Sequence, residues 1–443
     1  MTKIMTTILA LVMVLLDWVA YRRLKRENAG KIPRYSFCSV ILLSYVVILA
    51  VPVFMYAVIT PDNGTSMMKF SMAILTGYLF FAVCRMLLYA FWLPSRRKVF
   101  KRIGIVASSL LMMIFLYSAF VTRTDYRINN VRLGFDNLPQ SFDGFKVAFI
   151  SDVHVGSMWD AEAELEKLSG VISSTDADVV LFGGDMVNLH HSELTAPLLA
   201  RLARISGRQG SFAVMGNHDT GKYIKGAEKA FYEQNRESLA AGLSSVGWTL
   251  LRDSTVYIKN GNDSIAITGI DYSDELLAYK HSFRAIEGFD VSGIYDDVPD
   301  GIFNITLSHL PQLWHTLCDG GYSDLTLSGH IHAMQMKFAG LSPAAFLCDE
   351  WSGLYERPEG KLYINDGIGS VGFFARIGAR PEVTLIELKS ENGKVKACAG
   401  RDWFVFVNGS LKQHMRYLPY GRYDTNAGYY SFGSTSISLP SVL

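Results

Sequence analysis

Five short fragments of the chain combine aspartate, asparagine and histidine in spacings that suit metal chemistry. They read Asp-Val-His, Gly-Asp, Gly-Asn-His-Asp, Ser-His and Gly-His-Ile-His. The polar residues that they supply are Asp152, His154, Asp185, Asn217, His218, Asp219, His309, His330 and His332. Imidazole and carboxylate groups together suit first-row metals such as Mn, Fe or Zn better than Ca or Mg alone. Five of the ten histidines lie in these fragments, which makes them the main candidate site.

Each fragment directly follows an apolar run that predicts a buried strand. The five runs span 146–150, 178–182, 211–215, 303–307 and 325–328. Further strands are predicted over 265–270, 361–366 and 383–388, and helices over 161–174, 192–205 and 225–246. Strands that alternate with helices are typical of an α/β domain. Because ligands of open α/β sheets bind outside the carboxyl ends of the strands, we expect the five fragments to meet there.

The fragments hold more ligands than one cation needs. They would hold two divalent metal ions, Mn, Fe or Zn, if one carboxylate bridged the pair. Two metals about 3.5–4 Å apart clamp the attacking and leaving oxygens of an in-line phosphoryl displacement and supply hydroxide near neutral pH. In an extended segment His330 and His332 would face one pocket, since side chains alternate along it. The predicted chemistry is metal-dependent hydrolysis of phosphate esters.

In this order, the fragments resemble the calcineurin-like metallophosphoesterase superfamily, over about residues 145–390. The closing stretch LYINDGIGSVGFFARIGARPEVTLIELK, residues 362–389, is similar to the membrane-anchored bacterial branch of phosphodiesterase-like members. The resemblance implies an α/β fold with a two-sheet sandwich flanked by helices. The chain departs from many relatives at Asn188 and at Ala333-Met334, and these departures concern the fit of the substrate.

The resemblance also implies a role for each polar residue of the fragments. The implied ligands are Asp152, His154 and His332 for the first metal and Asn217, His309 and His330 for the second, with Asp185 bridging. A hydroxide that bridges the metals would attack the phosphorus in line. His218 would contact the phosphate or protonate the leaving oxygen, and Asp219 would orient it.

The first quarter of the chain is far more apolar than the remainder. Four stretches are each about as long as a membrane-spanning helix, at 4–20, 37–59, 68–92 and 103–121. The first is predicted to be a retained anchor and not a cleaved signal, because its basic cluster follows the apolar run instead of preceding it. For Arg85, inside the third stretch, we favour pairing within the bundle or snorkelling over a functional role.

The basic residues of the short loops predict the orientation in the membrane. The first and third loops, at 22–34 and 96–102, are rich in lysine and arginine, whereas the second loop is not. Positive loops stay in the cytoplasm, so the large domain is expected on the other side of the cell membrane. The expected organisation is a transmembrane region over 1–121, a linker and lead-in strand over 122–144, the phosphoesterase domain over 145–392 and a tail over 393–443.

These features favour a membrane-anchored phosphoesterase that acts on lipid-linked or envelope phosphodiesters. Residues 371–376 with Trp351 would form an interfacial lip, unless the two phenylalanines pack in the core. The alternatives are a phosphomonoesterase acting on a phosphoprotein or nucleotide, and a non-catalytic envelope receptor or assembly protein. A net charge of +1 gives no reason to expect a nucleic-acid partner, and the five cysteines match no zinc pattern.

Overall fold

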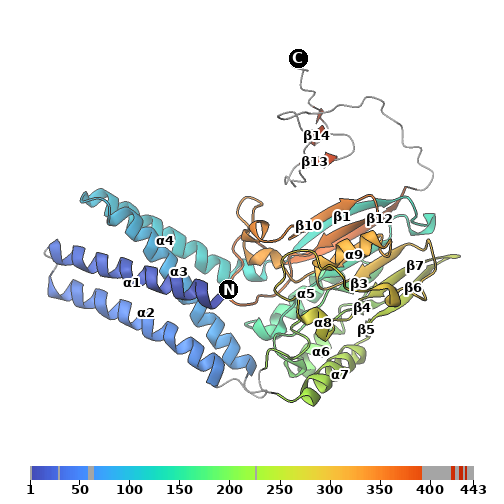
Figure 1. The fold of residues 1–443 in the computed structure, drawn as a ribbon, viewed down its shortest axis with the longest axis horizontal. Coiled ribbons are helices and arrows are strands. Elements are labelled where there is room, and N and C mark those ends of the chain that lie inside the picture. The colour runs from blue at the N-terminus through green and yellow to red at the C-terminus, as the bar shows by residue number, and fades with distance from the viewer. Residues whose placement is uncertain are drawn as a thin grey trace. The chain divides into compact units, whose positions relative to one another are not determined.

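The computed structural model divides into two units, residues 1–392 and 393–443, and each is described by itself (Figure 1). The described residues are 2–27, 30–57, 64–224, 227–391, 421–424, 429–432 and 435–436. The second unit corresponds to the tail of the sequence analysis. The structure describes three short antiparallel strands there, β13 (Gly421–Asp424), β14 (Tyr429–Phe432) and β15 (Thr435–Ser436).

The first unit contains two six-stranded mixed sheets. In spatial order, the first sheet consists of β1 (Arg127–Phe135), β12 (Glu382–Ser390), β2 (Lys146–Ile150), β3 (Val179–Phe182), β4 (Ser211–Ala213) and β5 (Trp248–Leu250). The second consists of β10 (Gly353–Arg357), β11 (Gly360–Ile364), β9 (Leu325–Ser328), β8 (Asn304–Leu307), β7 (Asp263–Gly269) and β6 (Ser254–Asn260). Strands β2 to β5 are parallel, as are β11, β9, β8 and β7, so their carboxyl ends share one edge of each sheet.

Strand β2 is apolar throughout because both of its faces are buried. Val147 and Phe149 point into the core between the two sheets, and Ala148 and Ile150 point into the layer between the first sheet and its helices. The same alternation holds in β3, with Val179 on the inner face. The two-sheet sandwich flanked by helices is the architecture that the resemblance implies.

Five helices belong to the sandwich, namely α5 (Ala161–Ser173), α6 (Ala196–Leu202), α7 (Lys229–Ser245), α8 (Asp274–Leu277) and α9 (Trp314–Asp319). Helix α5 begins after Asp160, whose carboxylate accepts the backbone N–H of Ala163 at 3.1 Å. Helix α6 is shorter than predicted, because a 3₁₀ turn at His191–Glu193 precedes it and Pro197 lies in its first turn.

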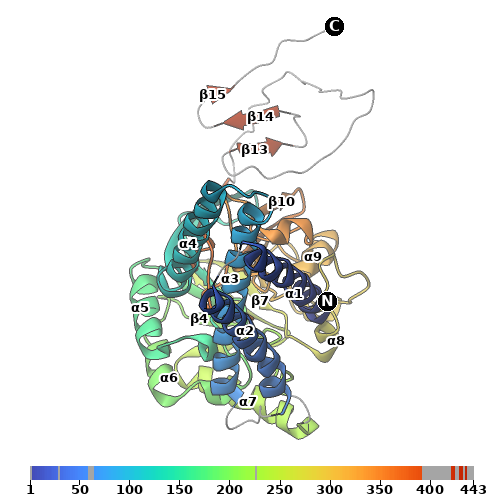
Figure 2. The ribbon, with the colours of Figure 1, turned by 90° about the vertical axis from the view of Figure 1, so that its left-hand side faces the viewer.

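Four long helices extend to one side of the sheets, namely α1 (Thr2–Arg26), α2 (Lys31–Ala57), α3 (Gly64–Trp92) and α4 (Lys98–Phe120) (Figures 1 and 2). Among the described residues, α3 and the stretch Lys98–Thr124 are long and apolar enough to cross a membrane, judged by length and composition. The four-span region therefore stays a prediction. Arg85 is buried and its Nη1 lies 3.3 Å from an oxygen of Asp17 on α1, so the expected pairing within the bundle is confirmed.

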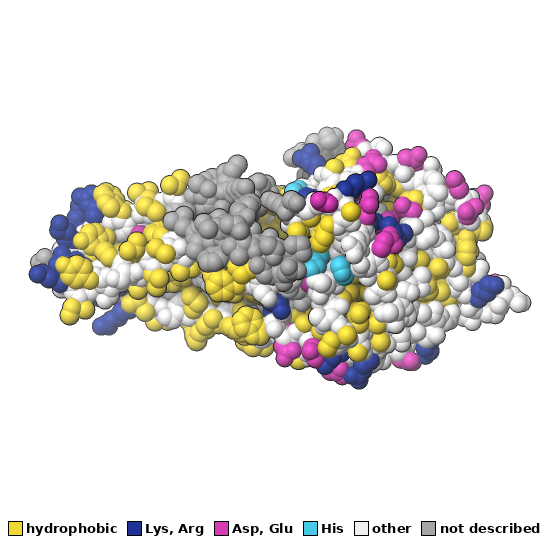
Figure 3. Space-filling model, turned by 90° about the horizontal axis from the view of Figure 1, so that it is seen from below, with side chains coloured by type: hydrophobic (Ala, Val, Ile, Leu, Met, Phe, Trp, Pro, Cys, Tyr) yellow, Lys and Arg dark blue, Asp and Glu magenta, His cyan; other side chains and the backbone are white. Residues whose placement is uncertain are grey.

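The basic ends of the helices lie together, away from the sheets. The Arg23 guanidinium at the end of α1 donates to the carbonyl oxygens of Leu93 at 2.7 Å and Ser95 at 2.6 Å, in the turn between α3 and α4. Figure 3 shows Lys and Arg side chains gathered at this far end and hydrophobic side chains along the helices.

The near end of the bundle is joined to the sandwich by buried polar contacts. Arg123, just after α4, forms two hydrogen bonds with the Glu164 carboxylate, at 2.8 and 2.9 Å. The Phe374 N–H donates to Oγ1 of Thr76 on α3 at 2.7 Å, and the Phe374 side chain is buried. Arg376 is fully buried as well. Of the two alternatives for residues 371–376, packing in the interior therefore holds for Phe374, whereas Phe373 is partly buried against a cluster of α3 and α4.

Candidate metal centre

The predicted site residues follow the carboxyl ends of β2, β3 and β4 in the first sheet and of β8 and β9 in the second. Five of them have a left-handed backbone, namely Asp152, His154, Asp185, His330 and His332. This conformation is uncommon for residues other than glycine, and such backbone strain clusters at functional sites. The sharp turn after each strand brings these side chains toward one place between the sheets.

The side chains form three overlapping groups, in each of which the possible ligand atoms lie within 4.8 Å of one another. The groups are Asp152 with His154 and His332, His154 with Asp185 and His218, and Asp185 with His309 and His330. The Asp185 carboxylate belongs to two of them, with an oxygen 3.3 Å from Nε2 of His309 and 3.6 Å from Nε2 of His154.

Asn217 joins the group around His309. Its Oδ1 lies 3.1 Å from Nε2 of His309, and its amide nitrogen donates to the hydroxyl of Tyr223 at 2.9 Å. The seven residues predicted as ligands are thus brought together within one buried cluster.

The ring nitrogens of the histidines fit a bound cation. Both nitrogens of His154 are buried and have no hydrogen-bond partner among the described residues, and burial lowers the pKa of this ring to about 3, which keeps it neutral. Nδ1 of His309 donates to the Gly183 carbonyl at 2.7 Å, and Nε2 of His330 donates to the Lys280 carbonyl at 3.1 Å. Nε2 of His309 then faces the oxygens of Asp185 and Asn217, so this ring is held by a backbone carbonyl on one side and turned toward the other candidate ligands on the other, an arrangement common to metal-binding histidines.

The electrostatics of the cluster also favour positive charge within it. Burial alone would raise the pKa of Asp152, but His332 beside it holds that pKa well below its usual range. Burial opposes protonation of His309, yet the nearby Asp185 carboxylate raises the pKa of the ring to about 9. Buried carboxylates that gather positive charge in this way suit divalent cations.

Two glycines of the fragments are required by close approach. A Cβ atom on Gly216 would lie 2.2 Å from Oδ1 of Asp185, and one on Gly329 would lie 2.4 Å from Oδ2 of Asp152. Both distances are far shorter than van der Waals contact. Gly216 and Gly329 therefore leave room for the carboxylates of Asp185 and Asp152, which any larger residue would displace.

Comparison with known proteins agrees with this geometry. A family model for the calcineurin-like phosphoesterases matches residues 145–334. Residues 145–334 are a calcineurin-like metallophosphoesterase domain. The domain is that of a metal-dependent hydrolase.

Three relatives illustrate the range of proteins that carry this domain. The metallophosphoesterase YkuE of Bacillus subtilis is 29% identical over 266 residues, which cover 58% of this chain and 82% of the relative. A transmembrane protein with metallophosphoesterase domain of Danio rerio is 28% identical over 270 residues, covering 59% of this chain and 57% of the relative. The UDP-2,3-diacylglucosamine pyrophosphatase LpxG of Chlamydia muridarum is 26% identical over 310 residues, covering 60% of this chain and 88% of the relative.

Within the phosphoesterase domain, the Asp219 carboxylate does not contact the His218 ring as expected. Its carboxylate accepts the backbone N–H groups of Asp185, Val187 and Gly216, at 2.8, 3.0 and 2.9 Å. Nδ1 of His218 instead donates to the Asn188 carbonyl at 2.7 Å. The expectation that Asp219 orients the His218 ring is therefore wrong, because a backbone carbonyl makes that contact.

A supporting loop after β11 was missed by sequence reasoning. The Gly369 N–H donates to the Asp152 carbonyl at 2.7 Å, and the Ile368 N–H donates to the Ser151 carbonyl at 3.0 Å. The buried Arg376 holds this loop, since its Nε donates to the Gly369 carbonyl at 2.7 Å and its Nη1 to the Asp366 carbonyl at 2.8 Å. These contacts involve backbone atoms, so residue type gives little sign of them.

Tyr223 was also missed. Its ring stacks on the His218 ring with centroids 4.1 Å apart and an interplanar angle of 9°. Tyr223 also packs against a buried cluster that includes Met68 and Met72 of α3, so the candidate metal centre is linked to a long helix of the bundle through one aromatic side chain.

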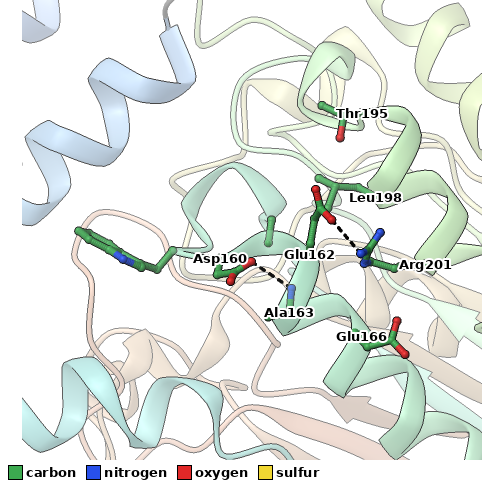
Figure 4. A pocket seen from close by; sticks show the side chains of 9 residues that line it. Asp160, Glu162, Ala163, Glu166, Thr195, Leu198 and Arg201 are labelled. Carbon is green, nitrogen blue, oxygen red and sulfur yellow. Dashed lines mark hydrogen bonds and ion pairs between the residues drawn. The ribbon is translucent and has the colours of Figure 1, made fainter.

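A hollow of about 800 Å³ lies apart from the metal centre, beside the start of α5 (Figure 4). Glu162 and Arg201 in its lining form an ion pair at 2.7 Å. None of the predicted ligands lines this hollow, so it is a surface feature of α5 and α6 and not the metal site.

Proposed function

We propose that the chain is a membrane-anchored phosphoesterase that binds two divalent cations and hydrolyses phosphodiesters of lipid-linked or envelope molecules outside the cytoplasm. The observation that carries the proposal is the position of Asp185, whose carboxylate oxygen lies 3.6 Å from Nε2 of His154 in one proposed ligand set and 3.3 Å from Nε2 of His309 in the other. A carboxylate shared in this way is what two neighbouring cations require.

Apart from Asp185, the six proposed ligands form two sets of three, one for each cation. Asp152, His154 and His332 would hold one cation, and Asn217, His309 and His330 the other. When bound, the two cations would lower the pKa of water and stabilise charge on the phosphoryl oxygens. Mn, Fe and Zn all suit this mixture of imidazole, carboxylate and amide ligands.

His218 is the proposed proton donor to the leaving oxygen. Its Nδ1 is engaged by the Asn188 carbonyl, so the proton that it can deliver is the one on Nε2. Burial lowers the pKa of this ring. A bound phosphate anion would favour the protonated ring, which fits a role as general acid during the reaction.

The proposed orientation follows from the two basic loops. Because Arg23 contacts the turn between α3 and α4, both basic loops lie at one end of the bundle, opposite the end that is joined to the sandwich. Positive loops stay in the cytoplasm. A multi-pass chain of the cell membrane would therefore place the phosphoesterase domain on the non-cytoplasmic side.

Two observations support a substrate that resides in the membrane. The cluster of Met68, Met72 and Tyr223 connects α3 to the His218 ring, so the proposed active site lies beside the bundle. One relative, LpxG, carries a name that describes a pyrophosphatase of a diacylated glucosamine nucleotide. A phosphodiester held at the bilayer surface would reach this site without leaving the membrane.

The experiment is a substrate panel assayed with the purified full chain, with Mn²⁺ added. We expect turnover of an aryl phosphodiester and of lipid phosphodiesters in vesicles, and none of either by Asp185→Asn. Turnover by Asp185→Asn at the wild-type rate would refute the role of the shared carboxylate. Turnover of phosphomonoesters or nucleotides alone would refute the lipid substrate, and a chain that neither binds metal nor hydrolyses any ester would refute the enzyme.

A further inference from the structure

The sandwich exposes few large apolar side chains, and most of them lie on one segment. Between residues 125 and 391, the large hydrophobic residues that the structure describes as exposed are Trp159, Tyr257, Phe338, Leu341, Phe346 and Leu347. Four of these six lie between residues 338 and 347. We refer to residues 337–348 as the apolar loop. Its most exposed member is Phe346, at 87%.

The apolar loop is held in a defined conformation. Phe338 and Leu341 exchange backbone hydrogen bonds of 2.8 and 3.0 Å, and the Ser342 hydroxyl donates to the Ala333 carbonyl at 2.6 Å. At its base, Ala344 and Cys348 are buried in a small apolar cluster. The exposed side chains therefore project from an ordered turn.

The loop leaves the sandwich next to α3 and α4. The Lys337 N–H donates to the Ile377 carbonyl at 2.8 Å, and Ile377 packs in a buried cluster with Phe80 of α3 and Phe115 of α4. In Figure 1 the orange segment between β9 and β10 lies on the side of the sheets from which these helices extend. The last turn of α4 adds Phe120, which is 70% exposed. Met336, immediately before the loop, also packs against this cluster, so the loop begins beside α3 and α4.

Trp159 is a further exposed apolar residue near the bundle. It is 69% exposed, and its ring lies 6.2 Å from that of Phe374, which is on the same segment as Ile377. Tyr257 differs, because it lies on the edge strand β6 and its hydroxyl donates to the Asp297 carbonyl at 3.0 Å. Trp159 and the start of the apolar loop therefore both lie beside the segment 373–377, which packs against α3 and α4.

We propose that the apolar loop inserts into the interfacial layer of the same bilayer that α3 and α4 cross. The inference rests on the proposed membrane anchoring but does not depend on the substrate. A lipid surface is the occupant that fits, because the loop exposes four large apolar side chains and begins beside helices that would themselves contact lipid. The candidate ligand His332 begins the short turn His332–Gln335, and only residues 333–336 separate it from the loop. Insertion would hold the metal centre at the level of the headgroups.

The test measures the depth of a nitroxide label in the full chain, reconstituted in phosphatidylcholine and phosphatidylglycerol vesicles. The label is placed at Phe346→Cys and, as a matched control, at Tyr257→Cys, both in a background of Cys38→Ser and Cys398→Ser. The remaining three cysteines are buried. Collision rates with oxygen and with a water-soluble nickel complex are compared at the two positions. We expect the oxygen-to-nickel ratio at 346 to exceed that at 257 several-fold.

Two results would overturn the proposal. A label at 346 that meets the nickel complex as freely as the label at 257 does would place the loop in water. A label shielded from both reagents would mean that protein, either a second copy or another part of this chain, covers the loop. Neither result depends on catalysis, so turnover of the aryl phosphodiester by the same samples tests the proposed function separately.

Discussion

The Asp219 carboxylate accepts the backbone N–H of Asp185 at 2.8 Å, although the two residues follow different strands. It also accepts the N–H of Gly216, just before Asn217. One buried side chain therefore fixes the turn that carries the shared carboxylate and the turn that carries a ligand of the second proposed cation. We therefore infer that Asp219 positions residues of the candidate metal centre.

This arrangement predicts that Asp219→Asn weakens metal binding. An asparagine has a single acceptor oxygen and an N–H₂ group that would face backbone donors, so at least one of the three bonds is lost. Outer partners of metal ligands typically contribute about 10- to 100-fold in affinity or activity. We expect a loss of that size in Mn²⁺ affinity, measured by titration calorimetry.

His218→Asn is the matched comparison for Asp219→Asn. This substitution should lower turnover while leaving Mn²⁺ affinity close to that of the wild type, because His218 is the proposed proton donor and not a ligand. If Asp219→Asn instead kept full metal affinity and changed only the pH profile of turnover, Asp219 would act through His218, as the family resemblance implied.

Gly216→Ala is predicted to disrupt the candidate metal centre through a steric clash with the Asp185 carboxylate. The new methyl group would lie 2.2 Å from Oδ1 of Asp185, so the carboxylate must move. Overpacking of this kind costs about 1–3 kcal/mol, and we expect a lower Tm together with loss of turnover. Gly170→Ala is the control, because a Cβ there meets nothing within 4 Å and lies in α5, where alanine is favoured. Equal effects of the two substitutions would contradict the explanation.

The candidate metal cluster was predictable because five of the chain's ten histidines fall in short polar fragments just after apolar runs. Asp152 and His330, for example, come just after apolar runs. Parallel strands bring their carboxyl ends to one edge of the sheet, so these residues were expected to meet. The partners of these residues were not predictable. The Asn188 carbonyl that holds His218 and the Gly369 N–H that holds Asp152 are backbone groups, which every residue type provides.

The fold was predicted less completely than the cluster. Strand β2 begins and ends where its apolar run does, since both faces are buried. Strands β6 and β10 lie at sheet edges and have half-exposed patterns, so their sequences lack a continuous apolar run. The parallel pairing of β1 with β12 joins segments that are far apart in the chain, and no local pattern specifies it.

Arg376→Lys tests the support of the loop beside Asp152. A lysine cannot reach the Gly369 and Asp366 carbonyls together, so a buried acceptor would remain without its partner, at a cost of about 1–3 kcal/mol. We expect a lower Tm and reduced turnover. Arg380→Lys serves as the control, because Arg380 forms a half-exposed ion pair with Asp125 that contributes little. If Arg376→Lys kept the wild-type turnover and Tm, the hydrogen bonds from Arg376 would not be what holds the loop beside Asp152.

The buried Glu193 carboxyl is expected to make the stability of the folded chain depend on pH. Burial raises the pKa of this carboxyl to about 7, against the opposing hydrogen bonds that it accepts from the Asn188 and Leu189 N–H groups and the Thr65 hydroxyl. In the unfolded chain, Glu193 ionises near the ordinary pKa of a glutamate. Its ionisation therefore disfavours the folded state as the pH rises from about 4.5 to 7, by roughly 3 kcal/mol in all.

Glu193→Gln cannot ionise, and its Tm should fall less than that of the wild type between pH 5 and pH 8. The surface substitution Glu275→Gln should keep the wild-type slope, and an unchanged slope in Glu193→Gln would mean that Glu193 is already ionised at pH 5.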